Sequence, residues 1–245
     1  MPSSFYDHLW GSAWGDQQCL GPVHRHLQKL LVPVVAGLKV RTVVEVGCGS
    51  GDNLAALAAG GDYELTGTDI APGALDLAKQ RVPQARLLLL DIEKEALPEQ
   101  FDLVMSLQVV EHIPNDLAAL EHLARMSKGY VLISTIGGRM RPFEIAIGHL
   151  RNYSTLELQR KLAAVGLAII KVWGWGFPFY SPLYRTLSEW LPGGPPMGPM
   201  GKWHRLAARA LYQLYRFNWP GKGDVLYALA RVRRPDGQGN GPKPE

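Results

Sequence analysis

The stretch Val43-Val44-Glu45-Val46-Gly47-Cys48-Gly49-Ser50-Gly51 decides the fold of this chain. The β-branched run at its start, residues 42–46, predicts a buried strand. Three glycines at alternate positions then predict a tight turn whose backbone can approach a ligand closely. The helix expected from residue 53 onward offers free N–H groups and a positive dipole end to that ligand. The stretch therefore predicts a strand, a ligand-binding loop and a helix in succession.

A glycine turn of this kind also occurs at nicotinamide and flavin sites, so the ligand class needs further observations. The dinucleotide fingerprint requires glycine at the position that Asp52 occupies here. Glu45 lies two residues before the first glycine, where an acid suits a cationic ligand better than a pyrophosphate. Both details disfavour a dinucleotide.

Strand-like and helix-like segments alternate along the rest of the chain, which predicts an α/β domain with helices on the faces of a sheet. Strands are expected at residues 42–46, 63–68, 86–90, 101–106, 130–135, 168–173 and 225–232, with 86–90 buried. Helices are expected at 24–37, with a kink at Pro33, at 53–59 and 116–126, and after the capping box formed by Ser154 and Glu157.

Acidic residues follow two further strands. Asp69 ends the second strand, where a carboxylate can accept both hydroxyls of a ribose. Asp91 ends the third strand, beside the place that an adenine amino group would take. Taken singly, each acid reads as a helix cap or a solvated side chain. Together with Glu45, they place three acids at three consecutive strand ends beside a glycine loop, which indicates a nucleoside-containing ligand.

With these motifs, the chain resembles the class I S-adenosylmethionine-dependent methyltransferases, and among them the ubiquinone-biosynthesis O-methyltransferase type. The motifs are EVGCGSG at 45–51, TDI at 68–70, DIE at 91–93, FDLV at 101–104 and VEHI at 110–113. The resemblance is specific across about residues 40–136 and weaker to about 173. It implies a Rossmann-like, seven-stranded, mostly parallel sheet of order 3-2-1-4-5-7-6, with an antiparallel last strand and a helical cap insertion.

The resemblance also implies which residues hold S-adenosylmethionine. The methionine part would lie on the loop of Gly47, Cys48, Gly49 and Gly51, supported from below by Glu45. The remaining contacts implied are Asp69 to the ribose hydroxyls, Ile70 packed on the adenine, Asp91 with Ile92 at the adenine edge, and Gln108 or Val109 near the sulfonium. Cys48 is a common residue in such loops, and no chemistry is assigned to it.

A hydroxyl acceptor needs a general base, and histidine suits that work near neutral pH. The candidates are His112 at the carboxyl edge of the sheet and His149 with Tyr153 in the segment after the fifth strand. Alternatively, Glu111-His112 only positions the following helix, and His149 only ties a loop to its neighbour. The sequence shows no second cluster of histidines and carboxylates, so no metal is expected.

Composition narrows the class of protein. Of the 245 residues, 47% are hydrophobic and 20% are charged, which is ordinary for a folded protein. Two cysteines supply neither a disulfide framework nor a four-thiolate metal site. The sequence shows neither a signal peptide nor an apolar run long enough to span a bilayer. A cytoplasmic protein is expected, and peripheral membrane contact stays open.

Four regions are expected. Residues 1–40 would form an N-terminal cap and helix with an irregular, Trp-containing start, and Trp10 and Trp14 could wall a pocket. Residues 41–173 and 223–234 would form the methyltransferase domain, and 235–245 a disordered tail. Residues 174–222 are aromatic-rich and basic, and would form a mobile cap, with 191–201 as hinge and a helix at 203–217 as its wall. That helix could instead lie on a membrane or in a homodimer interface.

The expected reaction is methyl transfer to an oxygen of a small aromatic, lipid-like or glycosylated metabolite. A nucleic-acid methyltransferase is one alternative, because residues 171–234 hold ten Lys and Arg against two Asp and Glu. Against it, Gln108-Val109-Val110-Glu111 stands where base-amino methylation uses an Asn/Asp-Pro-Pro-Tyr/Phe signature. A non-catalytic scaffold with this fold is the second alternative, and a nicotinamide oxidoreductase is the third.

Overall fold

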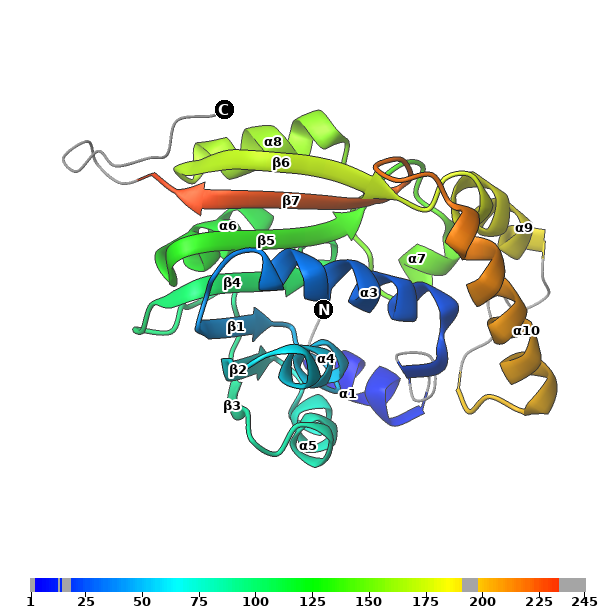
Figure 1. Cartoon of the computed structure of the whole chain (residues 1–245), viewed down its shortest axis with the longest axis horizontal. Helices are drawn as coiled ribbons and strands as arrows, with labels where there is room; N and C mark the ends of the chain where they lie inside the picture. The colour runs from blue at the N-terminus through cyan, green and yellow to red at the C-terminus, as the bar shows by residue number, and fades with distance from the viewer. Residues whose placement is uncertain (1–2, 13, 15–18, 191–197, 234–245) are drawn as a thin grey trace.

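The chain is described by a computed structural model that covers residues 3–12, 14, 19–190 and 198–233. A seven-stranded sheet runs through the centre and carries helices on both faces (Figure 1). The strands are β1 Thr42–Val46, β2 Glu64–Asp69, β3 Arg86–Leu89, β4 Phe101–Leu107, β5 Ser127–Ile136, β6 Leu167–Trp175 and β7 Val225–Val232.

The strand order is β3-β2-β1-β4-β5-β7-β6, as the resemblance implies. Neighbours from β3 to β5 are parallel, whereas β7 is antiparallel to both β5 and β6. In β1, Val44 pairs with Thr66 of β2 on one side and with Val104 of β4 on the other. β2 and β3 follow β1 in the sequence and lie on one side of it, whereas β4, the next strand, lies on the other side. A topological switch point therefore lies at the carboxyl ends of β1 and β4, where ligands bind in such sheets.

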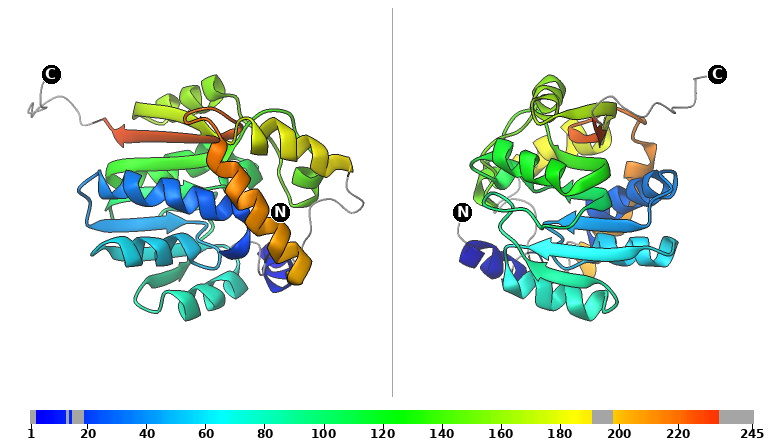
Figure 2. Two further views of the ribbon diagram at one scale, coloured as in Figure 1. Left: turned by 45° about the vertical axis from the view of Figure 1, so that its right-hand side comes forward. Right: turned by 90° about the vertical axis from the view of Figure 1, so that its left-hand side faces the viewer.

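Helices cover both faces of the sheet (Figures 1 and 2). One face carries α3, α4 and α5, and the other carries α6 and α8. Their bounds are α3 Pro22–Ala36, α4 Asp52–Gly60, α5 Pro72–Arg81, α6 Asp116–Arg125 and α8 Thr155–Ala164. The other helical segments are α1 Ser3–Ser12, η1 Val110–His112, α7 Pro142–Ala146, η2 Phe179–Tyr184, α9 Arg185–Leu187, η3 Ser188–Trp190, α10 Lys202–Leu214 and η4 Tyr215–Phe217.

Each face of the sheet has its own hydrophobic core. In β1, Val43 packs with Leu54 and Leu57 of α4, whereas Val44 packs with Leu120 of α6 on the other side. Successive side chains point to opposite faces, so a strand covered on both faces is apolar throughout. This explains why three of the five residues of β1 are valines. The sheet ends are thereby fixed rigidly under the loops.

Two local expectations differ from the structure. The strand at 86–90 was expected to be buried, but β3 is an edge strand and Leu89 is 62% exposed. The start of the chain was expected to be irregular, whereas α1 forms a helix that contacts α5. The helix after Ser154 begins as expected, with the Ser154 side chain accepting from the Glu157 amide at 3.1 Å. The expected tail, 235–245, lies outside the described residues.

Within the part of the chain that is described, no helix has the length and apolar character needed to cross a bilayer.

Candidate active site

The glycine loop occupies the switch point between β1 and α4. Gly47, Gly49 and Gly51 have φ angles of 73°, 53° and 76°, a region that residues with a Cβ rarely adopt. The amides of Gly47 and Cys48 both donate to the Thr68 carbonyl, at 2.7 and 2.9 Å. These two hydrogen bonds hold the loop against the end of β2.

Asp69 lies at the end of β2, beside this loop. Its two carboxylate oxygens accept from the amides of Gly49 at 2.8 Å and Ala71 at 2.9 Å. Burial raises the pKa of Asp69, and the backbone hydrogen bonds oppose that shift. Each carboxylate oxygen retains a further lone pair. The side chain is thus held rigidly and can still accept hydrogen bonds from a ligand.

Glu45 is a buried acid beneath the loop, 1% exposed. One oxygen, Oε1, accepts from Asn53 Nδ2 at 2.7 Å, and Oε2 has no hydrogen-bond partner among the described residues. Burial raises the pKa of Glu45 to about 8. Oε2 can accept a hydrogen bond from a ligand, and a positive charge bound nearby would favour the ionised form of this acid.

A cavity of about 780 Å³ opens beside the loop. Nine of the residues expected to hold the cofactor line it: Gly47, Cys48, Gly49, Asp69, Ile70, Asp91, Ile92, Gln108 and Val109. Glu45 and Gly51 are not among its lining residues and would act from behind the loop. Trp10 and Trp14 form part of the wall, with ring centroids 4.9 Å apart. The cavity brings the ends of β1, β2, β3 and β4 to one ligand site.

A cluster of Glu111, His112 and His149 stands at the same cavity. One ligand atom from each residue lies within 4.8 Å of the others, and the two imidazole rings meet edge to face with centroids 4.5 Å apart. Among the described residues, Glu111 Oε1, His112 Nδ1 and His149 Nδ1 all lack hydrogen-bond partners. No second cluster of histidines and carboxylates was expected, but His112 and His149, each predicted as a candidate base, form one with Glu111, because residues 37 positions apart converge here.

Burial changes the acid–base properties of this cluster. It lowers the pKa of His112 to about 3 and that of His149 to about 4, and it raises the pKa of Glu111 to about 7. Both imidazoles are therefore neutral at neutral pH, and the carboxyl group titrates there. Two neutral imidazoles and a carboxylate can accept a proton or hold a divalent cation.

Tyr153, the third expected catalytic residue, lies elsewhere. Its hydroxyl donates to Asp116 Oδ2 at 2.5 Å, and Tyr153 is not among the residues that line the cavity. Its ring is buried in the core under α6 and α8, so the structure places it away from the expected methyl-transfer site. Tyr6 of α1 occupies that region instead, with its ring centroid 5.7 Å from that of His112. Tyr6 was not predicted, because α1 carries no motif.

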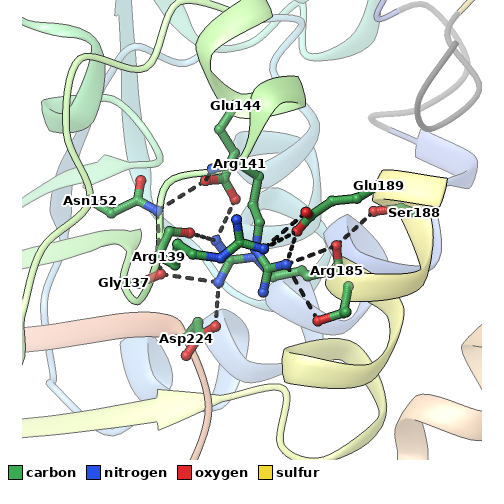
Figure 3. A network of polar contacts seen from close by, with 10 residues as sticks. Gly137, Arg139, Arg141, Glu144, Asn152, Arg185, Ser188, Glu189 and Asp224 are labelled. Atoms are coloured by element: carbon green, nitrogen blue, oxygen red, sulfur yellow. Dashed lines mark hydrogen bonds and ion pairs between the residues drawn. The ribbon is translucent and has the colours of Figure 1, made fainter. Parts of the chain in front are cut away.

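The far wall of the cavity is built on a network of ion pairs between the segment after β5 and the α9 region (Figure 3). Arg141 pairs with Glu189, and Arg185 pairs with Glu144 and Asp224. Arg185 also donates to the Gly137 carbonyl at 3.0 Å. Arg141 and Arg185 are 8% and 4% exposed, so both guanidinium groups are buried. The sequence did not predict this network.

The expected cap is only partly supported by the cavity wall. Tyr180, Tyr184, Arg185, Ser188 and Glu189 of the 174–222 region line the cavity, but no described residue of α10 does. α10 packs instead on α3, where the His26 ring nitrogen Nε2 lies 2.9 Å from the Tyr212 carbonyl. The expectation that a helix at 203–217 walls the pocket is wrong. Residues 191–197 of the expected hinge lie outside the described residues.

Comparison with known proteins gives the same class. Residues 44–133 match the family model described as a methyltransferase domain. The chain is 30% identical over 151 residues to the ubiquinone biosynthesis O-methyltransferase of Paracidovorax citrulli, covering 57% of this chain and 62% of that protein. It is 38% identical over 104 residues to the malonyl-[acyl-carrier protein] O-methyltransferase of Anoxybacillus flavithermus, covering 40% of each. The chain thus spans less than two thirds of these relatives.

Solved structures extend the likeness over the whole fold. The possible histamine N-methyltransferase of Thermotoga maritima covers 94% of this chain with a TM-score of 0.64 and 17% identity. The magnesium protoporphyrin IX methyltransferase of Synechocystis with bound S-adenosylhomocysteine covers 86% with a TM-score of 0.56 and 17% identity. At these identities the likeness shows the fold, which is the Rossmann-like fold of these methyltransferases.

Residues 44–133 thus form a methyltransferase domain, in agreement with the family resemblance. The phosphoethanolamine N-methyltransferase 2 of Haemonchus contortus, which is similar in fold at 14% identity with a TM-score of 0.59, is solved in complex with S-adenosylmethionine, the cofactor expected here. The residues present fit it: Asp69 faces the cavity and each of its carboxylate oxygens has a further lone pair for the ribose, while Glu45 lies behind the loop with Oε2 lacking a partner among the described residues.

Proposed function

We propose that this protein transfers a methyl group from S-adenosylmethionine to an oxygen of a small acceptor held in the same cavity. The observation that carries the proposal is the position of the Glu111–His112–His149 cluster. His112 and His149 line the cavity that also contains Gly47, Asp69 and Gln108. A proton-accepting cluster beside the cofactor loop suits an acceptor that must lose a proton, such as a hydroxyl or phenol.

The sulfonium supplies an activated methyl group, so this chain's own residues have to orient the acceptor and remove its proton. His149 or His112, which line the cavity, would accept that proton, and their low pKa values require Glu111 to be ionised when they do so. Glu111 lies next to both rings and would stabilise the imidazolium that forms, as the carboxylate of a catalytic triad does. Trp10, Trp14 and Tyr6 form the N-terminal part of the wall and would exclude water from the site.

The acceptor class follows from the cavity wall. Aromatic side chains of α1 and η2 face the cavity together with the buried guanidinium groups of Arg141 and Arg185. Three carboxylates, from Glu144, Glu189 and Asp224, already pair with those groups. The combination favours an aromatic or lipid-like metabolite with polar hydroxyls over a strongly anionic one. Two relatives are named as O-methyltransferases, which agrees with transfer to oxygen.

The test uses S-adenosylmethionine with a labelled methyl group and four soluble probes: a catechol, a carboxylic acid, a sugar and an aromatic amine. We expect label on the catechol and none on the amine. His149→Asn should lose turnover while calorimetry shows unchanged cofactor affinity, and the exposed His204→Asn should behave as wild type. Label on the amine alone would refute transfer to oxygen. Full turnover by His149→Asn and His112→Asn would refute the role of the cluster.

A further inference from the structure

Helix α10 and the η4 turn that follows it have two different sides. One side is anchored: Ala208, Tyr212 and Tyr215 are buried, and His26 lies against the rings of Tyr212 and Tyr215. The other side carries an unbroken row of exposed apolar residues. This row, the α10 stripe, consists of Trp203, Leu206, Ala207, Ala210, Leu214 and Phe217.

The exposure of the large side chains in the α10 stripe is high. Trp203 is 81% exposed, Phe217 70%, Leu206 56% and Leu214 36%. Their spacing of three and four residues places them in one arc of about 100° on the helix surface. Over these 15 positions the arc runs about 21 Å along the axis at 1.5 Å per residue. A continuous exposed apolar surface of this kind marks an interaction site.

Cations border the stripe along one edge. Lys202, Arg205, Arg209 and Arg216 project within an arc of about 60° directly beside it. Residues 202–223 contain no Asp or Glu. Trp219 follows the helix and is 55% exposed, with the Lys222 ammonium 5.5 Å from its ring centroid. The surface is therefore apolar in the middle, basic at one edge and rich in tryptophan.

We infer that the α10 stripe and its basic edge seat the protein on the surface of an anionic lipid bilayer. An interfacial helix lies in the plane of the membrane, with its apolar face in the acyl boundary and Lys or Arg at the headgroups. Trp203 and Trp219 suit the headgroup level because their rings are apolar with one polar N–H.

The charge pattern favours a bilayer over two other partners that this surface could bind, a second copy of the chain and a nucleic acid. A second copy of the chain would bring one basic edge to the interface beside another, with no acidic side chain of this segment to pair with it. A nucleic acid would leave Trp203, Leu206 and Phe217 in water, since phosphates bind the cations alone. A bilayer matches both the apolar and the charged part. This inference concerns a surface outside the cavity and does not depend on the proposed acceptor.

The experiment is co-sedimentation of the full chain with vesicles, without acceptor or cofactor. One set contains phosphatidylglycerol mixed into phosphatidylcholine, and the other contains phosphatidylcholine only. We expect clear preference for the anionic vesicles. Raising the salt from 0.1 to 1 M shortens the Debye length from about 10 to about 3 Å and should release much of the bound protein.

Two matched pairs of variants locate the surface. Leu206→Glu on α10 is compared with Leu156→Glu on α8, because the two leucines are 56% and 53% exposed. Arg209→Glu is compared with the exposed Arg160→Glu. Leu206→Glu should weaken vesicle binding at least about ten-fold and Arg209→Glu about 25-fold, since each charge near an anionic surface changes binding about five-fold. Both control variants leave α10 unaltered. They should therefore bind within about two-fold of the wild type, apart from the general effect of net charge.

All four changes are at exposed positions, and unchanged melting temperatures would show that the fold is intact. Equal binding to both vesicle types would overturn the inference, as would full binding by Leu206→Glu and Arg209→Glu. Sedimentation velocity supplies the remaining outcome. A dimer that Leu206→Glu converts to a monomer, without vesicle binding by the wild type, would make the stripe an interface between copies and reject the membrane.

Discussion

The carboxylate of Asp69 accepts a hydrogen bond from the backbone amide of Gly49 at 2.8 Å, so the acid that ends β2 also holds the middle of the loop that follows β1. One side chain thus sets the loop conformation and faces the cavity. Loss of this carboxylate is expected to affect the loop and the cofactor together.

Asp69→Ala should weaken cofactor binding about ten- to a hundred-fold, because a charged hydrogen-bond acceptor is worth about 1.5–3 kcal/mol. Isothermal calorimetry with S-adenosylmethionine measures this. Asp62→Ala, at an exposed acid in the preceding loop, is the control and should bind normally. Unchanged affinity in the Asp69 variant would remove this residue from the cofactor site.

Gly49→Ala should destabilise the protein through two effects that can be separated. A Cβ at Gly49 would lie 2.3 Å from the Trp10 ring, and its φ of 53° is unfavourable for alanine by about 1–2 kcal/mol. Gly166→Ala is the control, because its φ is 79° and no atom lies within 4 Å of the new Cβ. The free energy of unfolding should fall more at Gly49, and Trp10→Ala should remove part of the excess. Additive effects of the two substitutions would contradict the contact.

Glu111→Gln should reduce kcat by about two to four orders of magnitude, the range for loss of general-base catalysis, because the histidine that accepts the proton loses the carboxylate that stabilises its charged form. The pKa of Glu111 is about 7, so the carboxyl group is protonated below that pH and ionised above it. Only the ionised form can stabilise a protonated imidazole. Turnover of the wild type should therefore rise with pH through about 7 and then level off, and the variant should lose this rise. Glu157→Gln on α8 should keep it.

The same kinetic measurement distinguishes direct proton transfer from metal-assisted transfer. Dialysis against EDTA should leave the wild-type rate unchanged if the cluster acts directly. A rate lost on dialysis and recovered with a divalent cation would show that Glu111, His112 and His149 act as ligands instead.

Arg185→Met should lower the free energy of unfolding by about 3–5 kcal/mol, because it leaves Glu144 and Asp224 without their buried partner. Arg139→Met is the control. Arg139 pairs with Glu189 at 2.6 Å but is 64% exposed, and such pairs contribute about 0–1 kcal/mol. Urea denaturation measures both. Equal losses in the two variants would show that burial does not determine the energetics of this network.

Asp102 gives a prediction for stability against pH. It accepts from the amides of Arg41 and Thr42 at 3.0 and 2.8 Å, and these bonds help to hold its pKa at about 2 in the folded state, below the usual 3.8. Its ionised form therefore stabilises the fold above about pH 4, and that contribution is lost as the pH falls toward 2. Asp102→Asn should lower the melting temperature at pH 7 and not at pH 2. A constant difference across this range would contradict the assignment.

The sequence predicted the fold because its strands are β-branched runs that end at glycines or acids, and because a known family shares those endings. β1 and β7 have the expected bounds. The apolar residues of β3 predicted that this strand is buried. They could not show that it is an edge strand, because edge position depends on the strand order. Asp52 was read only as a departure from a dinucleotide fingerprint, but its carboxylate pairs with Arg81 at 2.5 Å, a contact that fixes α4 to α5.

The candidate site was predictable where single strands deliver residues to it, as for Asp69 and Asp91. It was not predictable where distant segments meet. His149 is 37 residues beyond His112, and Arg185 is 41 residues beyond Glu144, so neither contact leaves a periodic pattern. The pKa values of the cluster depend on burial, which reverses the simple expectation that histidine titrates near neutral pH here and carboxyl groups do not.

β7 lies inside the sheet although it comes after every other strand in the sequence. In the described part of the chain, β6 pairs with β7 and with no other strand. It therefore cannot join the sheet until residues 225–232 leave the ribosome. During synthesis, β1 to β5 can associate first. Until β7 is available, β6 and the aromatic segment after it stay unpaired and expose apolar surface. A stalled or truncated chain would therefore present an open β5 edge, and its fate in the cell would depend on chaperones until the last strand is in place.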